Sequence, residues 1–155
     1  MTSPTETASP MPVAGDQAPK FKLAAYPEGE VSLDDYLGKK NVILAFYPRD
    51  NTPGCTKEMC AFSEDQAQFE SADTVVLGIS SDTIESHDKF AKQFGLKQKL
   101  LADSSGVVGK LYGTIVEGKT TSSRVLFIID KSGVIQYVIQ GMPENAQLLE
   151  MLAKI

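Results

Sequence analysis

The sequence predicts an α/β fold, a central mixed sheet flanked by helices, on the basis of three observations. Two continuous apolar runs, NVILAFYP at 41–48 and TVVLGIS at 74–80, are typical of strands buried on both faces. The segment between them, 53–70, has the apolar spacing of an amphipathic helix, and this strand–helix–strand order favours a right-handed parallel crossover. Apolar runs at 124–130 and 134–140 are joined by a Lys-Ser-Gly turn, which predicts a terminal antiparallel hairpin.

The remaining elements follow from local signals along the chain. Alternating polarity at 21–26 and 30–33 predicts a short leading hairpin or two small strands. One helical turn closed by Gly38 follows, and a helix is predicted over 81–95, with Asp82 or Thr83 as its N-cap and Gly95 at its end. The last predicted elements are a strand over 99–103, a short helix over 104–113 and a closing helix with Pro143 at its start. The resulting order, β-α-β-α-β-α-β-β-α, is a thioredoxin-like arrangement.

The domain organisation is simple, because 155 residues without internal repeats predict one domain. Residues 1–14 are rich in Ser, Thr and Pro, and we expect a flexible tail there and a single domain over 15–155. The N-terminus lacks the basic and apolar regions of a secretory signal, and no apolar run is long enough to span a bilayer. These features predict a cytoplasmic protein that does not enter the membrane.

The charge balance excludes several kinds of partner. A formal net charge of −5 and a pI near 4.9 argue against nucleic-acid binding, which needs a basic surface, and against an anionic membrane surface. Two cysteines do not imply a disulfide framework, and they fit a cytosolic protein with functional thiols. Two cysteines and the single histidine, His87, fall short of a four-ligand metal site, so we expect no metal or other cofactor.

The first cysteine lies where a helix would stabilise its charged form. Thr52 is a favourable N-cap, Pro53 suits the first helical position, and Gly54 allows another group to approach the backbone closely. Cys55 then falls in the first turn, where unpaired N–H groups and the helix dipole favour a thiolate, the reactive form of cysteine. The site also follows the carboxyl end of a strand, where α/β folds place their chemistry.

The second cysteine, Cys60, is too far from Cys55 to bond while the helix is intact. Their Cα atoms on an ideal helix are roughly 8–9 Å apart, beyond the ~7 Å limit for a disulfide. If Cys60 resolves an oxidised Cys55, the first turns must unwind during the cycle. The spacing therefore indicates a switch rather than a structural crosslink.

The pattern Pro48-x-x-x-Thr52-x-x-Cys55 resembles the active-site motif of peroxiredoxins, following a buried strand and opening a helix. The longer string FYPRDNTPGCTKEMC is similar to that of the peroxiredoxin Q group, also called bacterioferritin comigratory proteins. The resemblance extends over nearly the whole chain, through GDQAPKF, VVLGISSD and SRVLFIIDKSG. It implies a thiol peroxidase that reduces hydrogen peroxide and organic hydroperoxides and is recycled by thioredoxin or a similar dithiol. The resemblance also implies a monomer.

The resemblance also implies a role for each matching residue. Cys55 would be the peroxidatic cysteine, and Cys60 the resolving cysteine that joins it in a redox disulfide. Thr52 would hydrogen-bond the peroxide or the thiolate, and Pro48 would shield the site from water. The family's later-strand arginine is matched by Arg124.

Composition independently singles out Arg124, since the chain has thirteen lysines but only two arginines. A guanidinium offers several donors in a rigid fork and suits a thiolate beside a developing oxyanion. The other arginine, Arg49, lies in the loop next to the motif, and we expect it to be less important. We interpret Glu58 as a solvated carboxylate on a helix face, the alternative being that it orients one of the arginines.

Other interpretations remain open at this stage. The same thiols would serve a redox sensor, or a thiol–disulfide exchange protein, that lacks efficient turnover. A Cys–His hydrolase would need His87 beside Cys55, but His87 lies in the polar run SHDK, where we expect a surface position. Residues 113–120, GTIVEGKT, match a phosphate-binding loop, but the helix that such a loop requires does not follow. We expect this segment to be a loop that delivers Arg124.

Overall fold

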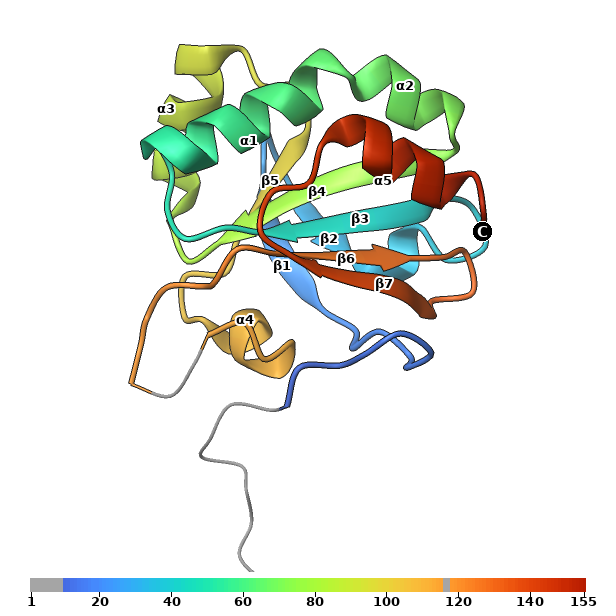
Figure 1. Cartoon of the computed structure of the whole chain (residues 1–155). Helices are drawn as coiled ribbons and strands as arrows, with labels where there is room; N and C mark the ends of the chain where they lie inside the picture. The colour runs from blue at the N-terminus through green and yellow to red at the C-terminus, as the bar shows by residue number, and fades with distance from the viewer. Residues whose placement is uncertain (1–9, 116–117) are drawn as a thin grey trace, which may run out of the picture.

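Seven strands form one mixed sheet with helices on both faces (Figure 1). The structure is a computed structural model that describes residues 10–115 and 118–155. In chain order the elements are β1 (Lys22–Tyr26), β2 (Glu30–Ser32), a 3-10 turn η2 (Leu33–Asp35), β3 (Asn41–Phe46), α1 (Pro53–Glu64), α2 (Gln66–Ser71), β4 (Thr74–Ser80), α3 (Ile84–Phe94), β5 (Lys99–Ala102), α4 (Val107–Leu111), β6 (Val125–Ile129), β7 (Ile135–Gln140) and α5 (Asn145–Leu152).

The strand order across the sheet is β2-β1-β5-β4-β3-β6-β7. The central strands β3, β4 and β5 are parallel, while β6 runs antiparallel to β3 and β7 antiparallel to β6. The leading hairpin of β1 and β2 lies at the opposite edge and joins the sheet through β1 and β5. The predicted α/β fold, with a mixed sheet flanked by helices, is confirmed.

Two apolar cores lie on the two faces of the sheet. Every residue of β3 is buried, which explains its continuous apolar sequence. Leu44 and Phe46 pack on the face that also buries Tyr112, whereas Ile43 and Ala45 point to the other face. That second face is covered by α1, α2, α3 and α5, and α4 lies on the first (Figure 1).

The helix predicted over 53–70 is two helices, α1 and α2, separated at Asp65. Asn145, at the start of α5, donates from Nδ2 to the Ala61 carbonyl and to Asp65 Oδ2, both at 2.9 Å. A side chain eighty residues further along the chain therefore contacts both sides of the break. The helix α3 agrees with its prediction, with Thr83 as the N-cap and Gly95 in the left-handed conformation at its end.

The N-terminal segment lies partly outside the described residues, which begin at Pro10. Within the described part, Met11 packs against the first core, and the Gly15 N–H donates to the Ile135 carbonyl at 2.8 Å. The boundary between tail and domain stays a prediction.

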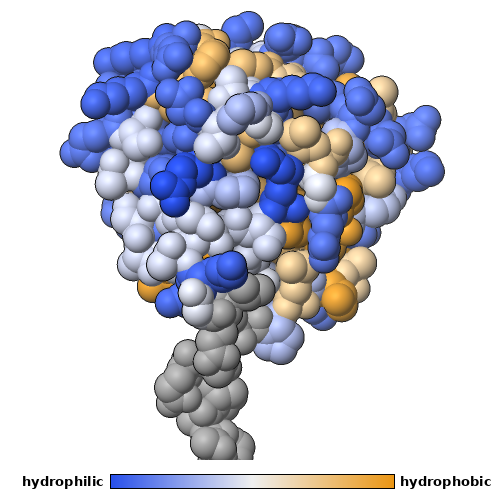
Figure 2. Space-filling model, turned by 60° about the vertical axis from the view of Figure 1, so that its left-hand side comes forward, coloured by the Kyte–Doolittle hydropathy of each residue, from blue (hydrophilic) through white to orange (hydrophobic). Residues whose placement is uncertain are grey.

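Much of the face drawn in Figure 2 is polar. Hydrophilic residues occupy most of the upper part of the face in Figure 2, and hydrophobic residues gather toward its right-hand and lower right-hand edges. Within residues 10–115 and 118–155, no helix has the length and apolar character needed to cross a membrane.

Candidate active site

Cys55 lies in the first turn of α1, fully buried at the end of β3. The helix starts at Pro53 after Thr52, whose backbone is extended (φ −98°, ψ 154°). Thr52 occupies the N-cap position as predicted, but its hydroxyl does not cap the helix. It donates instead to the Arg49 carbonyl at 3.1 Å. Cys55 therefore stands in a first turn, where backbone N–H groups without intrahelical acceptors stabilise negative charge.

The Arg124 guanidinium lies over this turn. Val125 pairs with Phe46, so the antiparallel register of β6 and β3 brings Arg124 beside the loop that follows β3. A Cβ added at Gly54 would be 3.0 Å from Arg124 Nη2, so the glycine permits the approach. The burial of Arg124 by itself would lower its pKa, but the thiolate of Cys55 and the carboxylate of Glu58 outweigh this and raise it.

Glu58 corrects the sequence interpretation, because it is buried rather than solvated. Arg124 Nη1 donates to Glu58 Oε1 at 2.9 Å, with the two side chains 23 % and 4 % exposed. Burial raises the pKa of Glu58 to about 7, although the hydrogen bond and charge of Arg124 oppose the shift. Glu58 Oε2 has no hydrogen-bond partner among the described residues. The alternative interpretation, that Glu58 orients an arginine, agrees with this geometry.

Cys60 is half-buried in the middle of the same helix, and both cysteines are free thiols. Burial, followed by the negative charge of Glu64, raises the pKa of the Cys60 thiol. The surroundings of Cys60 therefore favour the neutral thiol, whereas Cys55 lies beside the cation of Arg124.

The second half of α1 is attached to the segment between α3 and β5. Gln98 Nε2 donates to the Met59 carbonyl at 3.0 Å, and the Lys97 N–H donates to Ser63 Oγ at 2.8 Å. The Ser63 hydroxyl in turn donates to the Gly95 carbonyl at 3.4 Å. Residues around Cys60 are therefore held by contacts that do not involve the turn of Cys55.

The loop between β3 and α1 holds the remaining predicted residues. Pro48 is half-buried beside the motif, and Arg49 is exposed and makes none of the ion pairs found among the described residues. Asp50 is buried and was not singled out by the sequence. His87 contradicts its predicted surface position: it is fully buried on α3, and its Nδ1 lies 2.7 Å from Asp50 Oδ2.

The segment resembling a phosphate loop does not have the structure that such a loop requires. Residues 116–117 lie outside the described residues, and Gly118 to Arg124 form neither helix nor strand. The Ser123 N–H donates to the Thr114 carbonyl at 2.8 Å, which closes the described part of the segment on itself. It leads directly into β6 and places Arg124 immediately before that strand.

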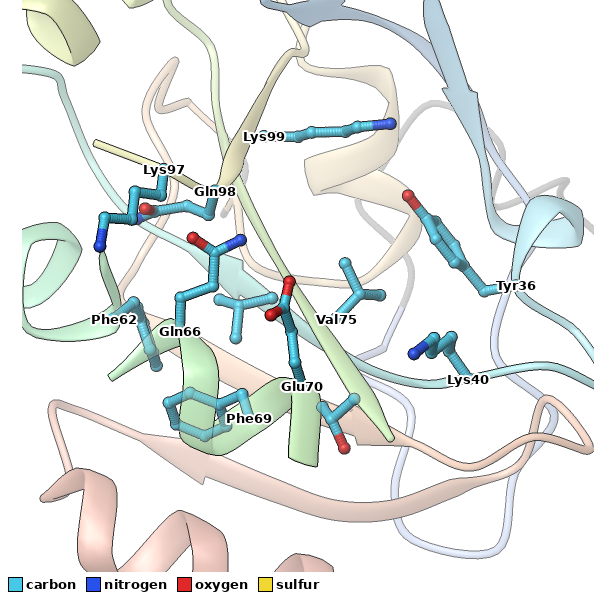
Figure 3. A pocket seen from close by; sticks show the side chains of 12 residues that line it. Tyr36, Lys40, Phe62, Gln66, Phe69, Glu70, Val75, Lys97, Gln98 and Lys99 are labelled. Carbon is cyan, nitrogen blue, oxygen red and sulfur yellow. The ribbon is translucent and has the colours of Figure 1, made fainter. Parts of the chain in front are cut away.

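A separate pocket of about 260 Å³ lies away from Cys55. Figure 3 shows Lys40, Lys99 and Tyr36 around it, with Gln66 and Glu70 rising from α2. No residue of the segment 48–60 lines this pocket. This cavity is therefore separate from the place of the chemistry predicted for the cysteines.

The family model described as AhpC/TSA matches residues 14–138. The chain belongs to the AhpC/TSA family. This peroxiredoxin is 41 % identical over 148 residues to a Coxiella burnetii protein named as a peroxiredoxin bcp, covering 91 % of this chain and 97 % of that protein. It is also 41 % identical over 134 residues to the chloroplastic peroxiredoxin Q of Sedum lineare, covering 84 % of this chain and 72 % of the relative.

Solved structures agree with this assignment. The crystal structure of peroxidoxin BcpB from Mycobacterium tuberculosis superposes with a TM-score of 0.85 at 30 % identity, covering 92 % of this chain and 97 % of that one. The resemblance to the Q and bcp peroxiredoxins and the thioredoxin-like fold are confirmed. This peroxiredoxin is a thiol-dependent peroxidase, an oxidoreductase that acts on peroxides.

Proposed function

We propose that Cys55 is the peroxidatic cysteine and Cys60 the resolving cysteine of this peroxiredoxin. The observation that carries the proposal is the placement of buried Cys55 in the first turn of α1 beneath the guanidinium of Arg124. A fixed cation and free N–H groups together stabilise the thiolate and the oxyanion that forms beside it. Thr52 hydrogen-bonds the peroxide, while Pro48 and Gly54 shape the site around the sulfur.

The cycle has three balanced steps. The Cys55 thiolate attacks one peroxide oxygen, the O–O bond breaks, and the alkoxide or hydroxide takes a proton and leaves as alcohol or water. Cys55 is now a sulfenic acid. The Cys60 thiol attacks its sulfur, releasing water and forming the Cys55–Cys60 disulfide. A dithiol protein then reduces this disulfide by thiol–disulfide exchange and becomes oxidised itself.

The second step requires the first turns of α1 to open. The two cysteines share one continuous helix, Pro53–Glu64, whose geometry keeps them too far apart to bond. The contacts of Gln98 and Ser63 hold the half that contains Cys60. We therefore infer that the turn carrying Cys55 moves and that Cys60 stays close to its position.

The substrates, the reductant, the oligomeric state and the location of this peroxiredoxin are also proposals. Hydrogen peroxide and organic hydroperoxides are the proposed substrates, and thioredoxin or a similar dithiol the proposed reductant. We propose a monomer located in the cytoplasm. The bacterial relative supports that location, whereas the relative from Sedum lineare is named as chloroplastic.

The decisive experiment measures intact mass and free thiols after one equivalent of hydrogen peroxide, for the native chain and for Cys60→Ser. We expect the native chain to lose both thiols and about two mass units, and Cys60→Ser to hold a sulfenic acid that a 1,3-diketone traps. Two unreacted thiols in the native chain would overturn the assignment. Oxidation without recycling by any dithiol protein would instead favour the redox-sensor alternative.

A second prediction concerns Gly54→Ala. The new methyl group would meet Arg124 Nη2 at 3.0 Å and displace the guanidinium by a few tenths of an ångström. We expect the rate constant with peroxide to fall about tenfold, because charge stabilisation depends on donor position. The midpoint of thermal unfolding is expected to stay the same or rise, since alanine favours a helix more than glycine does. Stopped-flow kinetics and thermal unfolding check the two parts, and an unchanged rate constant would contradict the role of the close contact.

A further inference from the structure

Both ring nitrogens of His87 have a hydrogen-bond partner inside the protein. The side chain is fully buried, with Nε2 2.8 Å from the Leu101 carbonyl and Nδ1 2.7 Å from Asp50 Oδ2. A backbone carbonyl can only accept, so Nε2 must donate. The protonation of Nδ1 then depends on whether Asp50 carries a charge.

Asp50 faces three hydrogen-bonding side chains. Its Oδ1 accepts from the Tyr47 hydroxyl at 2.5 Å, and its Oδ2 accepts from the Ser86 hydroxyl at 2.8 Å in addition to facing His87. Burial, followed by the negative charge of Asp50, raises the pKa of Tyr47, so the tyrosine remains a donor. A carboxylate at this position would accept from all three side chains, with His87 Nδ1 as the third donor. The two side chains would then form a buried imidazolium–carboxylate pair.

This pair supports the loop that carries the peroxiredoxin motif. Asp50 stands midway between Pro48 and Thr52, and its own N–H donates to Asp82 Oδ2 at 2.7 Å. The peptide on its N-terminal side presents the Arg49 carbonyl, which accepts the hydrogen bond of the Thr52 hydroxyl at 3.1 Å. Because the Thr52 hydroxyl donates its proton to this carbonyl, its oxygen can only accept a further hydrogen bond. The O–H of a hydroperoxide can donate that bond.

We propose that His87 and Asp50 are positioning residues for the peroxide step: their ion pair fixes the Arg49 carbonyl and thereby the direction of the Thr52 hydroxyl. The proposal rests on the function assigned above to Cys55 and Thr52. Neither His87 nor Asp50 touches the sulfur, so each acts through the loop. A residue that only stabilised the fold would affect every reaction of Cys55 alike, whereas this pair affects the reaction that uses Thr52.

The test compares two reactions of Cys55 in His87→Gln and in Asp50→Asn. The rate constants with hydrogen peroxide and with iodoacetamide are measured in parallel, because alkylation needs the thiolate but no peroxide-orienting hydroxyl. We expect the peroxide rate constant to fall roughly ten- to a hundredfold and the alkylation rate constant to stay within about threefold. Tyr112→Phe is the matched control: it removes a partly buried hydrogen bond from a fully buried tyrosine in the other core to the Pro19 carbonyl, and it is expected to change neither rate constant.

Either of two results would overturn the proposal: equal losses in both reactions, or no loss in the peroxide reaction. If the native chain itself reacts no faster with peroxide than with iodoacetamide, the proposed function of Cys55 fails instead. In a Thr52→Val background, the further substitution of His87 is expected to have little effect on the peroxide rate constant, because the group that it positions is absent.

A measurement on the native chain remains decisive if the variants do not fold. His87 is the only histidine, so imidazole ¹⁵N labelling gives one pair of ring resonances. We expect both nitrogens at the positions of protonated nitrogen, each with an attached proton protected from exchange. A neutral ring with a single N–H would overturn the ion pair.

Discussion

Replacing Arg124 with lysine is expected to slow the reaction of Cys55 with peroxide by roughly two to three orders of magnitude. The guanidinium extends over Gly54 toward the Cys55 sulfur and also donates to Glu58 Oε1 at 2.9 Å. The planar guanidinium of arginine can donate to the sulfur and to the carboxylate at the same time. The ammonium group of lysine, on a flexible chain, has no fixed geometry that serves both partners. The rate constant is measured by stopped-flow kinetics at several peroxide concentrations.

The chain provides a matched control in Arg49→Lys, since Arg49 is the only other arginine and is exposed. This variant is expected to react at the native rate to within about threefold. Both variants keep the positive charge, so equal losses from the two would show that the effect is not specific to the guanidinium geometry of Arg124. A native rate in Arg124→Lys would remove Arg124 from the proposed chemistry.

Glu58→Gln is expected to abolish a pH-dependent loss of stability in the native chain. Burial raises the pKa of Glu58 from 4.5 to about 7, so the folded chain retains a proton that the unfolded chain releases between these values. The free energy of unfolding is therefore highest below pH 4.5 and declines as the pH rises from 4.5 toward about 7. The shift corresponds to about 3 kcal/mol, and above pH 7 the carboxylate is ionised and paired with Arg124.

The measurement is the free energy of unfolding in denaturant at about pH 5 and about pH 8, for the native chain and Glu58→Gln. Native stability is expected to decline by about 3 kcal/mol more than that of the variant. Glu70→Gln, which changes an exposed carboxylate on α2, is expected to follow the native chain. Parallel pH profiles for the native chain and Glu58→Gln would show that Glu58 does not titrate in this range.

The sequence predicted the parts of the site that depend on local signals. The buried strand, the Thr-Pro-Gly start and the helix that follows placed Cys55 in a first turn, and the structure has it there. Arg124 was predicted from its rarity and from the family motif, and antiparallel pairing of β6 with β3 brings it beside that turn. The parallel crossover and the terminal hairpin likewise followed from apolar runs and turn residues.

What the sequence did not predict depends on contacts between distant segments. The polar run around His87 is typical of a surface, and only the loop that carries Asp50, thirty-seven residues earlier, provides the partner that allows burial. For Glu58 the sequence favours a solvated helix face over the alternative that it orients an arginine, and the arginine that it pairs with lies sixty-six residues away. In the same way, the helix break at Asp65 is hydrogen-bonded by Asn145, eighty residues later. Periodicity along one helix cannot show which side chains face it from elsewhere.

The attachment of the second half of α1 has a consequence for how the molecule opens. Gln98, Ser63 and Asn145 hold residues 59–65, and none of these bonds involves the sulfur chemistry. Amide hydrogen exchange in the disulfide form should then be fast in the first two turns and slow in the last, within one helix of twelve residues. The free energy needed to expose the sulfur would be set by a few contacts around Arg124, leaving the sheet undisturbed. Evolution could thus adjust the lifetime of the sulfenic acid by substitutions in this first turn without altering the stability of the whole domain.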